Sequence, residues 1–499
     1  MGFGERLRGR AVPVSLTIAL VGIVAAIYGR SCSFHFVNWD DGIHVYQNRS
    51  VMAPGEVGPA ERWFPRTLGY PMPLTIATYR LDRWRVGAPR DFGPQDGAAF
   101  HATNVLIGAL LVLAVLSLAL QVLPWKAALA GTAVFALHPV NTEMIAWISG
   151  RKDLLALALA LVATTSWIRF LRTGAAWWSL GFLVLGLSAL AAKPSAVFLL
   201  PLALYLLWLS REGQVESGRG RWVTILPLAV LAVAACAAVI VSYEWNRAVG
   251  GVETPATWAA VPRRALWAFG RHMSLVLSPV ALRARYLADP SGLSGYDLLG
   301  GVTVVAALLG LRLAPRGINA IQLGLAVGLL GYLPMSSLIP LRRYISTIYA
   351  VPLALGMVLV AAGVVCQHLG SLRLLVRRII AACAIALTLL LATLTWNQVG
   401  TWRDSVTLWQ HQAALEPRNA MDCRMLGHAF GYEGDLEAAI KTYTACAHQF
   451  GLSAFANNLG VSHFMKGRYR EAEKYFRWIL QRDPDDRRAR KYLGLIRER

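Results

Sequence analysis

The stretch Phe36–Tyr46 (FVNWDDGIHVY) lies between the first long apolar segment of the chain, at 11–29, and the second, at 103–122. Its two adjacent carboxylates, Asp40 and Asp41, stand where a membrane helix would return the chain to water. Ionisable side chains at such a position are often functional in membrane proteins. The alternative is a solvated acidic pair at a helix end, and the rest of the chain has to decide between the two interpretations.

The composition indicates a polytopic membrane protein. Of the 499 residues, 56% are hydrophobic and only 15% are charged, which is too apolar for a soluble chain of this length. The net charge of +21 would suggest nucleic acid as a partner, but the Lys and Arg residues stand mostly in short loops between apolar runs. That placement orients helices against anionic lipid, so we expect a bilayer and no nucleic acid as partner.

Apolar segments along the chain predict about eleven transmembrane helices. The first follows a basic flank and lacks a small-residue cleavage site, so we expect it to remain as a membrane helix. The candidate spans are 11–29, 103–122, 126–139, 154–171, 176–192, 194–210, 222–243, 297–313, 317–335, 345–367 and 378–396.

Basic loops set the expected orientation. If every span crosses once, Lys126, Arg172 and Arg221 fall on the same side as the N-terminal arginines, and the positive-inside rule makes that side cytoplasmic. Asp40 and Asp41 then face outward. The segment 263–286 is apolar yet rich in arginine; we interpret it as an outer amphipathic helix, because a crossing there would move the later arginines outside.

A repeat follows the last candidate span. Leu426-Gly427 recurs as Leu459-Gly460 and Leu493-Gly494, and small and aromatic residues accompany these pairs at the spacing of tetratricopeptide repeats. We therefore predict an all-α protein with a membrane domain at 1–397 and an extracytoplasmic repeat domain at 398–499. The outer loops of the membrane domain would be 30–102, 139–153, 244–296 and 336–344.

Cys423 and Cys446 stand symmetrically about the turn of one predicted helical hairpin. Their side chains could therefore face each other, and an outward compartment would permit a disulfide between them. The alternative is a pair of small buried thiols packed within the hairpin.

Acidic and basic side chains gather on the expected outer face. A carboxylate can deprotonate an acceptor hydroxyl, while Arg and Lys neutralise a departing phosphate, so the mixture suits transfer of a group from a phosphate-linked donor. The residues are Asp40, Asp41, His44, His138, Glu143, Arg151, Lys152, Asp153, Lys193, Arg342 and Arg343.

Three of the basic residues have two interpretations each. Arg342 and Arg343 violate the charge rule that orders the other loops, which favours binding of a lipid phosphate; the alternative is interfacial snorkelling. Lys193, which interrupts two apolar runs, has the same two interpretations. Oxygen ligands from Asp40, Asp41 and Glu143 would suit a divalent cation, but no local spacing requires one.

Sequence motifs of other chemistries are missing. The chain contains no P-loop, no Gly-x-Ser-x-Gly elbow, no His-Glu-x-x-His and no dinucleotide fingerprint, so nucleotide-driven chemistry is not expected. It also lacks a clear pair of inverted halves, which weakens a transporter interpretation.

The joint order of several motifs resembles the transmembrane and tetratricopeptide-repeat-containing O-mannosyltransferases and their bacterial relatives. The resemblance covers nearly the whole chain. It rests on Trp39-Asp40-Asp41 with Tyr46, Tyr70-Pro71 with Pro73-Leu74-Thr75, His101 with Asn104, His138-Pro139 with Glu143, Gly150-Arg151-Lys152-Asp153, Lys193-Pro194, Arg343-Tyr344, Trp402 with Asp404, and Leu408-Trp409.

This resemblance implies a C-type glycosyltransferase fold and a polyprenyl-phosphate sugar as donor. It makes Asp40 the candidate general base and Asp41 a residue that orients acceptor or donor. Donor phosphate would be bound by Arg343, Arg342, Lys193, Arg151 and Lys152, with His44, Tyr46, His138, Glu143 and Asp153 shaping the site or contacting acceptor. The chain departs from the family at Arg342-Arg343-Tyr344 and Arg285-Tyr286, where an acid is replaced by a base.

The composition, rich in Ala, Gly and Arg, suggests a bacterial inner-membrane protein with its repeats in the periplasm. We expect it to transfer a sugar to a hydroxyl of a protein or an envelope glycan, with the acceptor docked on the repeats. The alternatives are a non-catalytic scaffold that recruits envelope partners and a transporter of lipid-linked sugar.

Overall fold

The computed structural model describes residues 12–65, 69–87, 92–211, 221–252, 258–286, 292–339 and 343–499, and every regular element in these ranges is helical. The chain forms two compact units. The membrane unit comprises Met1–Ser33, Ile43–Phe92 and Gly97–Gly400. The repeat unit comprises Phe34–Gly42, Gly93–Asp96 and Thr401–Arg499. The sequence predicted a boundary at 397/398; the repeat unit instead begins at Thr401 and also includes two pieces of the first predicted outer loop.

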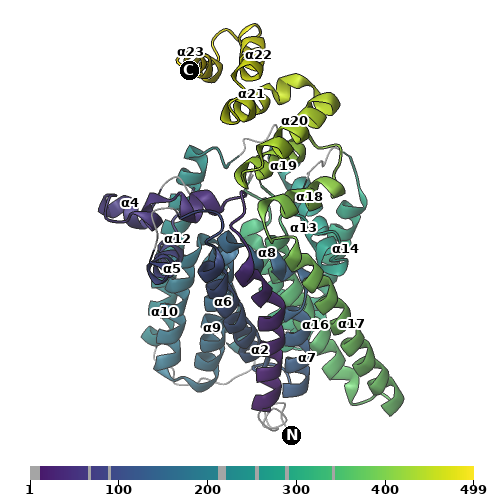
Figure 1. Ribbon diagram of the computed structural model, residues 1–499. Helices are drawn as coiled ribbons and strands as arrows, with labels where there is room; N and C mark the ends of the chain where they lie inside the picture. The colour runs from purple at the N-terminus through teal and green to yellow at the C-terminus, as the bar shows by residue number, and fades with distance from the viewer. Residues whose placement is uncertain are drawn as a thin grey trace. The chain divides into compact units, whose positions relative to one another are not determined.

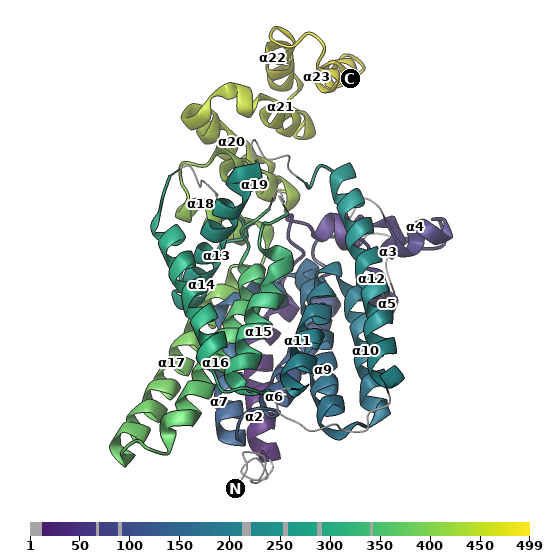
Figure 2. The same cartoon turned by 180° about the vertical axis from the view of Figure 1, so that it is seen from behind.

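Each of the eleven predicted spans overlaps a helix of the membrane unit. These helices are α2 (Val14–Gly29), α6 (Ala98–Ala119), α7 (Trp125–Ala136), α9 (Arg151–Thr173), α10 (Ala176–Ala192), α11 (Leu199–Arg211), α12 (Arg221–Ala248), α14 (Gly295–Leu313), α15 (Ala320–Tyr332), α16 (Val351–Leu369) and α17 (Leu374–Gly400). They run side by side in Figures 1 and 2.

Among the described residues, seven helices are long and apolar enough to cross a membrane: those that contain α2, α6, α9, α12, α14, α16 and α17. Three more apolar helices are shorter, at Ala176–Ala192, Pro194–Ser210 and Ala320–Met335. Helix α7 has only 12 residues, fewer than the ~20 that a helix needs to cross a bilayer unaided. The chain is therefore a multi-pass membrane protein, and the number eleven stays a prediction.

Further helices join these spans. They are α3 (Arg49–Met52), α4 (Pro59–Trp63), α5 (Pro73–Val86), α8 (Thr142–Ala146) and α13 (Val261–Leu277). Helix α13 covers most of the ambiguous segment 263–286 and is not among the candidate spans in the described part of the chain. Its apolar residues are buried on one side, including Trp267 and Met273, while Arg263 and Arg264 are exposed or half-buried on another.

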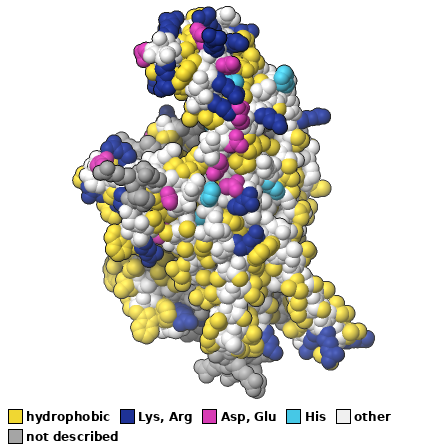
Figure 3. Space-filling model, viewed as in Figure 1, with side chains coloured by type: hydrophobic (Ala, Val, Ile, Leu, Met, Phe, Trp, Pro, Cys, Tyr) yellow, Lys and Arg dark blue, Asp and Glu magenta, His cyan; other side chains and the backbone are white. Residues whose placement is uncertain are grey.

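The two ends of the membrane unit differ in character. The start of α2, the α9–α10 connection and the α16–α17 connection lie at one end (Figures 1 and 2). Figure 3 shows hydrophobic side chains over the helices and a group of Lys and Arg at the tip of α16–α17. Because α9 begins at Arg151 and ends beside Arg172, the residues just before Arg151 lie at the opposite end, which the charge rule makes the outer one.

Helical hairpins build the repeat unit. Its helices are α18 (Ser405–Leu415), α19 (Ala420–Tyr432), α20 (Leu436–Phe450), α21 (Ala456–Met465), α22 (Tyr469–Leu480) and α23 (Arg487–Arg497). A methyl group on Gly427 would collide with the Tyr443 ring, and one on Gly460 would collide with Phe476. Glycine therefore lets the two helices of each hairpin approach, as the repeat pattern predicted.

The structure joins Cys423 on α19 to Cys446 on α20 by a disulfide, with Cα atoms 6.0 Å apart. Cys32, Cys236, Cys366 and Cys383 are free thiols.

We expect a maleimide-polymer reagent to label four cysteines in the denatured, unreduced protein and six after reduction. Closing a loop of 23 residues should stabilise the hairpin by about 3 kcal/mol, so reduction should also lower its unfolding temperature. Equal labelling before and after reduction would disprove the disulfide.

Candidate functional site

Glu143 lies on the short helix α8, in the turn that leads into α9, and its side chain is only 2% exposed. The Arg343 Nη2 donates to Glu143 Oε1 at 2.6 Å, and the Ser346 hydroxyl lies 3.3 Å from the same oxygen. Arg343 Nη2 also donates to the Ala284 carbonyl at 2.9 Å. Glu143 thus binds the segment at 343–346, some 200 residues away in the sequence.

Opposing effects act on the Glu143 carboxyl. Burial raises its pKa above the usual range, the charge and hydrogen bond of Arg343 lower it, and the nearby Asp153 carboxylate raises it. Burial has the largest effect, so the pKa of Glu143 is raised on balance. The Arg343 guanidinium opposes this effect of burial and favours the charged form of Glu143.

Two further cations lie close to this pair. Lys193, at the end of α10, binds Asp153 of α9 with an Nζ–Oδ1 distance of 2.5 Å. Lys152 Nζ donates to the Ser149 carbonyl at 2.7 Å and lies 3.4 Å from His44 Nδ1. Burial, followed by the charges of Lys152 and Lys193, lowers the pKa of His44 well below its usual range. His44 is therefore a neutral acceptor for Lys152.

These groups form one anion-attracting cluster, which we call the cation cluster: Lys152, Lys193, Arg343, Glu143, Asp153 and His44. Its three cations and two carboxylates leave one net positive charge, since His44 is neutral. Beside it lies a cavity of about 50 Å³, lined by Asp153, Ser195 and Tyr349 among others. That space is large enough for only a few water molecules.

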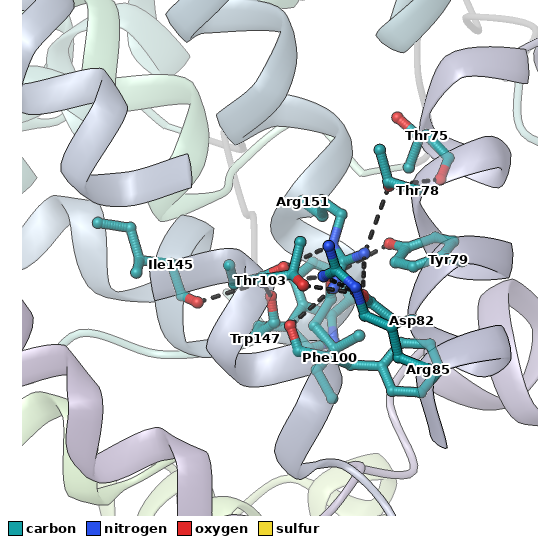
Figure 4. A network of polar contacts seen from close by, with 12 residues as sticks. Thr75, Thr78, Tyr79, Asp82, Arg85, Phe100, Thr103, Ile145, Trp147 and Arg151 are labelled. Atoms are coloured by element: carbon teal, nitrogen blue, oxygen red, sulfur yellow. Dashed lines mark hydrogen bonds and ion pairs between the residues drawn. The ribbon is translucent and has the colours of Figure 1, made fainter. Parts of the chain in front are cut away.

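A second polar network joins α5, α6 and the start of α9 (Figure 4). Arg151 Nη1 lies 2.5 Å from Asp82 Oδ2 of α5, and neither side chain has any exposed surface. Arg151 also donates to Asn104 Oδ1 at 2.7 Å and to the Phe100 carbonyl at 2.7 Å. Thr103 donates to the other Asp82 oxygen at 2.6 Å.

This network holds the turn that carries Glu143. Asn104 Nδ2 donates to the carbonyls of Ile145 and Trp147 at 3.2 and 3.0 Å, and the Tyr79 hydroxyl donates to Ile148 at 3.1 Å. Gly150 completes the turn, because a Cβ there would lie 2.7 Å from the Glu143 carbonyl oxygen. The backbone between Glu143 and Arg151 is thereby fixed by side chains of α5 and α6.

Arg151 was predicted to bind donor phosphate, and the structure corrects that prediction. Its guanidinium is fully buried, and its hydrogen bonds are already used by Asp82, Asn104 and the Phe100 carbonyl. An incoming phosphate would have to displace a buried carboxylate, which would be left without its cation. We assign Arg151 a structural role.

His138 is also buried and acts on the backbone. Its Nδ1 accepts from the Val140 amide at 3.2 Å, so Nε2 carries the proton and donates to the Val276 carbonyl at 3.0 Å. Burial lowers the pKa of His138 to about 4, although the Val276 hydrogen bond opposes this. His138 therefore joins the turn before Glu143 to the end of α13 as a neutral side chain.

Asp40 and Asp41 belong to the repeat unit. Asp41 is 1% exposed, and its Oδ2 accepts from the Val37 amide at 2.9 Å, so it closes the turn of its own loop. Asp40 is half-buried. Among the described residues, no three or more His, Cys, Asp or Glu side chains are grouped so that they could hold a metal ion, and a metal at Asp40, Asp41 and Glu143 stays an untested prediction.

The remaining predicted residues divide into two cases. Arg342 lies outside the described residues. Tyr46 is half-buried at the end of the helical turn Gly42–Tyr46, and its role stays a prediction.

Sequence reasoning missed Asp82, Ser346 and His272. Asp82 stands among basic residues of α5, and an acid in such surroundings is normally interpreted as a solvated surface charge. His272 is buried on α13 and accepts from the Ser346 amide at 3.3 Å. Only the fold shows that Ser346 meets both His272 and Glu143, because nothing in the local sequence links the three.

Comparison with known proteins finds a repeat family and a group of similar proteins. A tetratricopeptide-repeat family model matches residues 424–486 and 457–499. The protein O-mannosyl-transferase Tmtc2 of Drosophila melanogaster is 32% identical over 244 residues, which are 46% of this chain and 24% of that protein. The resemblance to these O-mannosyl-transferases is confirmed.

Two mouse proteins of the same kind match as well. TMTC1 is 29% identical over 35% of this chain and 19% of its own length, and TMTC4 is 26% identical over 37% and 28%. The chain thus spans about a quarter of the length of the O-mannosyl-transferases it matches.

Two solved structures are similar at low scores. One is the oligosaccharyltransferase of Archaeoglobus fulgidus tethered to an acceptor peptide, with a TM-score of 0.44 and 15% identity over 77% of this chain and 55% of that one. The other is ArnT of Cupriavidus metallidurans bound to undecaprenyl phosphate, with a TM-score of 0.39 and 17% identity over 93% and 80%. Both TM-scores are below 0.5, so neither likeness carries an argument.

Proposed function

We propose that this chain is a membrane glycosyltransferase of the C type that transfers a sugar from a polyprenyl-phosphate donor to an acceptor hydroxyl. The likeness to O-mannosyl-transferases supports the class of reaction. The observation that carries the donor chemistry is the cation cluster, which gathers Lys152, Lys193 and Arg343 at the expected outer end of the membrane unit. Such a group suits a lipid phosphate.

In the proposed reaction the acceptor hydroxyl oxygen attacks the anomeric carbon of the sugar. The bond from that carbon to the phosphate oxygen breaks, and the lipid phosphate leaves with the electron pair. Asp40 takes the hydroxyl proton as general base. The cation cluster offsets the negative charge that the leaving phosphate gains, and the configuration at the sugar carbon is inverted.

The proposed location follows from the charge rule and the composition. The chain would reside in a bacterial inner membrane, with the repeats in the periplasm and an undecaprenyl-like lipid as carrier. The repeats would dock the acceptor, which is a protein Ser/Thr side chain or an envelope glycan.

The test uses purified full-length protein with radiolabelled polyprenyl-phosphate mannose and a Ser/Thr-rich peptide, scored for free lipid phosphate and labelled peptide. We expect Arg343→Met to raise the KM for the lipid donor by roughly tenfold or more, because a charge-assisted hydrogen bond to phosphate is lost. Arg373→Met is the matched control, since Arg373 is exposed at the opposite end of the membrane unit.

A double variant, Glu143→Gln with Arg343→Met, removes the buried charge that Arg343→Met alone would leave unpaired. It should fold like wild type and keep the raised KM. No release of lipid phosphate by the wild type would reject the transferase and favour a scaffold or a transporter. A KM for Arg343→Met equal to that of Arg373→Met would reject the role of Arg343.

A further inference from the structure

The loop that carries Asp40 is built into the repeat unit by side chains far along the chain. The Asn38 backbone N–H donates to the Ser405 hydroxyl at 3.0 Å, and Trp409 Nε1 donates to the Asn38 side-chain oxygen Oδ1 at 2.8 Å. Ser405 and Trp409 lie on α18, and both are fully buried. Some 370 residues separate the partners in sequence, so these bonds exist only in the folded protein.

Further contacts surround the same loop. The Trp39 ring meets the Trp409 ring edge-on, with centroids 5.4 Å apart. The His35 amide donates to the Arg403 carbonyl at 2.9 Å, and His35 Nδ1 lies 3.4 Å from Glu433, in the turn between α19 and α20. Residues directly before Asp40 are therefore held by α18 and by the first repeat.

We infer that α18 positions the general base: Ser405 and Trp409 fix Asn38 and Trp39, and thereby set the direction of Asp40. This inference rests on the proposed function, because it assigns to Asp40 the role of base. Ser405 and Trp409 are positioning residues, since they act through the loop. The repeat unit thus has a second task besides docking, namely to hold the base in its reactive geometry.

Misplacement of a catalytic group should lower the rate of the chemical step strongly and change the affinity for the donor only slightly, because only the transition state needs the base in position. Trp409→Phe removes the hydrogen bond to Asn38 and keeps an aromatic ring in the buried space. We expect kcat to fall roughly tenfold, with the KM for polyprenyl-phosphate mannose within about twofold of wild type. Ser405→Ala should give a change in the same direction.

The matched control is Trp478→Phe. Trp478 lies on α22 of the same unit, where Arg482 stacks on its ring at 3.8 Å. Its replacement by Phe is the same chemical change at a site away from the loop. We expect its kcat to equal that of wild type. Hydrogen exchange of the full chain in detergent gives a readout independent of turnover: peptides covering 34–42 should exchange roughly tenfold faster in Trp409→Phe and Ser405→Ala, and normally in Trp478→Phe.

Equal kcat in Trp409→Phe and Trp478→Phe, or unchanged exchange over 34–42, would overturn the inference. The proposed function fails separately. If Asp40→Asn turns over like wild type, Asp40 is not the base, and its assignment falls together with the positioning role of α18, while the transferase activity stands. If Asp40→Asn is inactive while Trp409→Phe is fully active, only the positioning role of α18 is lost.

Discussion

Asp40→Asn is expected to lower sugar transfer by roughly 10²- to 10⁴-fold, the range usually lost with a general base. An amide cannot take the proton of the acceptor hydroxyl. The substitution changes neither the size of the side chain nor its half-buried position, so the folded state should persist. Release of free lipid phosphate, measured at saturating donor, gives the rate directly.

Asp41→Asn is the matched control, because it makes the same change one residue along. Asp41 accepts a hydrogen bond from the Val37 amide, and an Asn side-chain oxygen can accept that bond too. The loop should therefore keep its shape, and we expect transfer within about tenfold of wild type. The two variants rank adjacent acids that the sequence alone ranked only by resemblance.

Two results would contradict this assignment. Wild-type turnover in Asp40→Asn would remove Asp40 from the chemistry. A large loss in Asp41→Asn beside an active Asp40→Asn would exchange the two roles. Thermal unfolding and the exchange rate of peptides covering 34–42 separate lost chemistry from a lost fold in either case.

The amino-acid sequence predicted the features that depend on local pattern. Apolar runs indicated the membrane helices, and Leu-Gly pairs at intervals of 33 and 34 residues indicated the repeats, because helix packing needs small residues at fixed spacing. The family resemblance ranked Asp40 first. These predictions needed no knowledge of which distant residues meet.

The sequence could not predict which side chain each charged residue contacts. Arg151 and Lys152 are adjacent, yet Arg151 binds Asp82 in the interior while Lys152 faces His44. Both were predicted to bind phosphate. Their directions differ because consecutive residues of a helix point about 100° apart, and only the packing of α5 and α6 against α9 decides which one meets Asp82.

The contacts of the loop that carries Asp40 could not be predicted either. The sequence placed Trp409 in the predicted repeat domain at 398–499 and Asn38 in the predicted outer loop at 30–102. The hydrogen bond between them depends on contacts across 371 residues. Such long-range pairing leaves no periodic signal in a single sequence, and so it could not be predicted from residue patterns.

The second large effect is expected at the buried pair of Arg151 and Asp82. Arg151→Met should destabilise the membrane unit by about 3–5 kcal/mol, because it leaves the Asp82 carboxylate buried without its cation. The unfolding temperature in detergent should fall by roughly 6 °C or more. Arg85→Met is the matched control: Arg85 lies 3.6 Å from the same carboxylate but is 52% exposed, so its loss should cost less than about 1 kcal/mol.

A double variant, Asp82→Asn with Arg151→Met, shows whether the effect comes from charge. It removes both ions, and an amide at position 82 can still accept from Thr103. We expect it to recover much of the stability that Arg151→Met loses, since replacing both members of a buried pair is often close to neutral. A double variant as unstable as Arg151→Met alone would show that Arg151 acts through its bonds to Asn104 and the Phe100 carbonyl. In that case the loss would measure how tightly the turn bearing Glu143 is held, and transfer activity should fall in proportion to it.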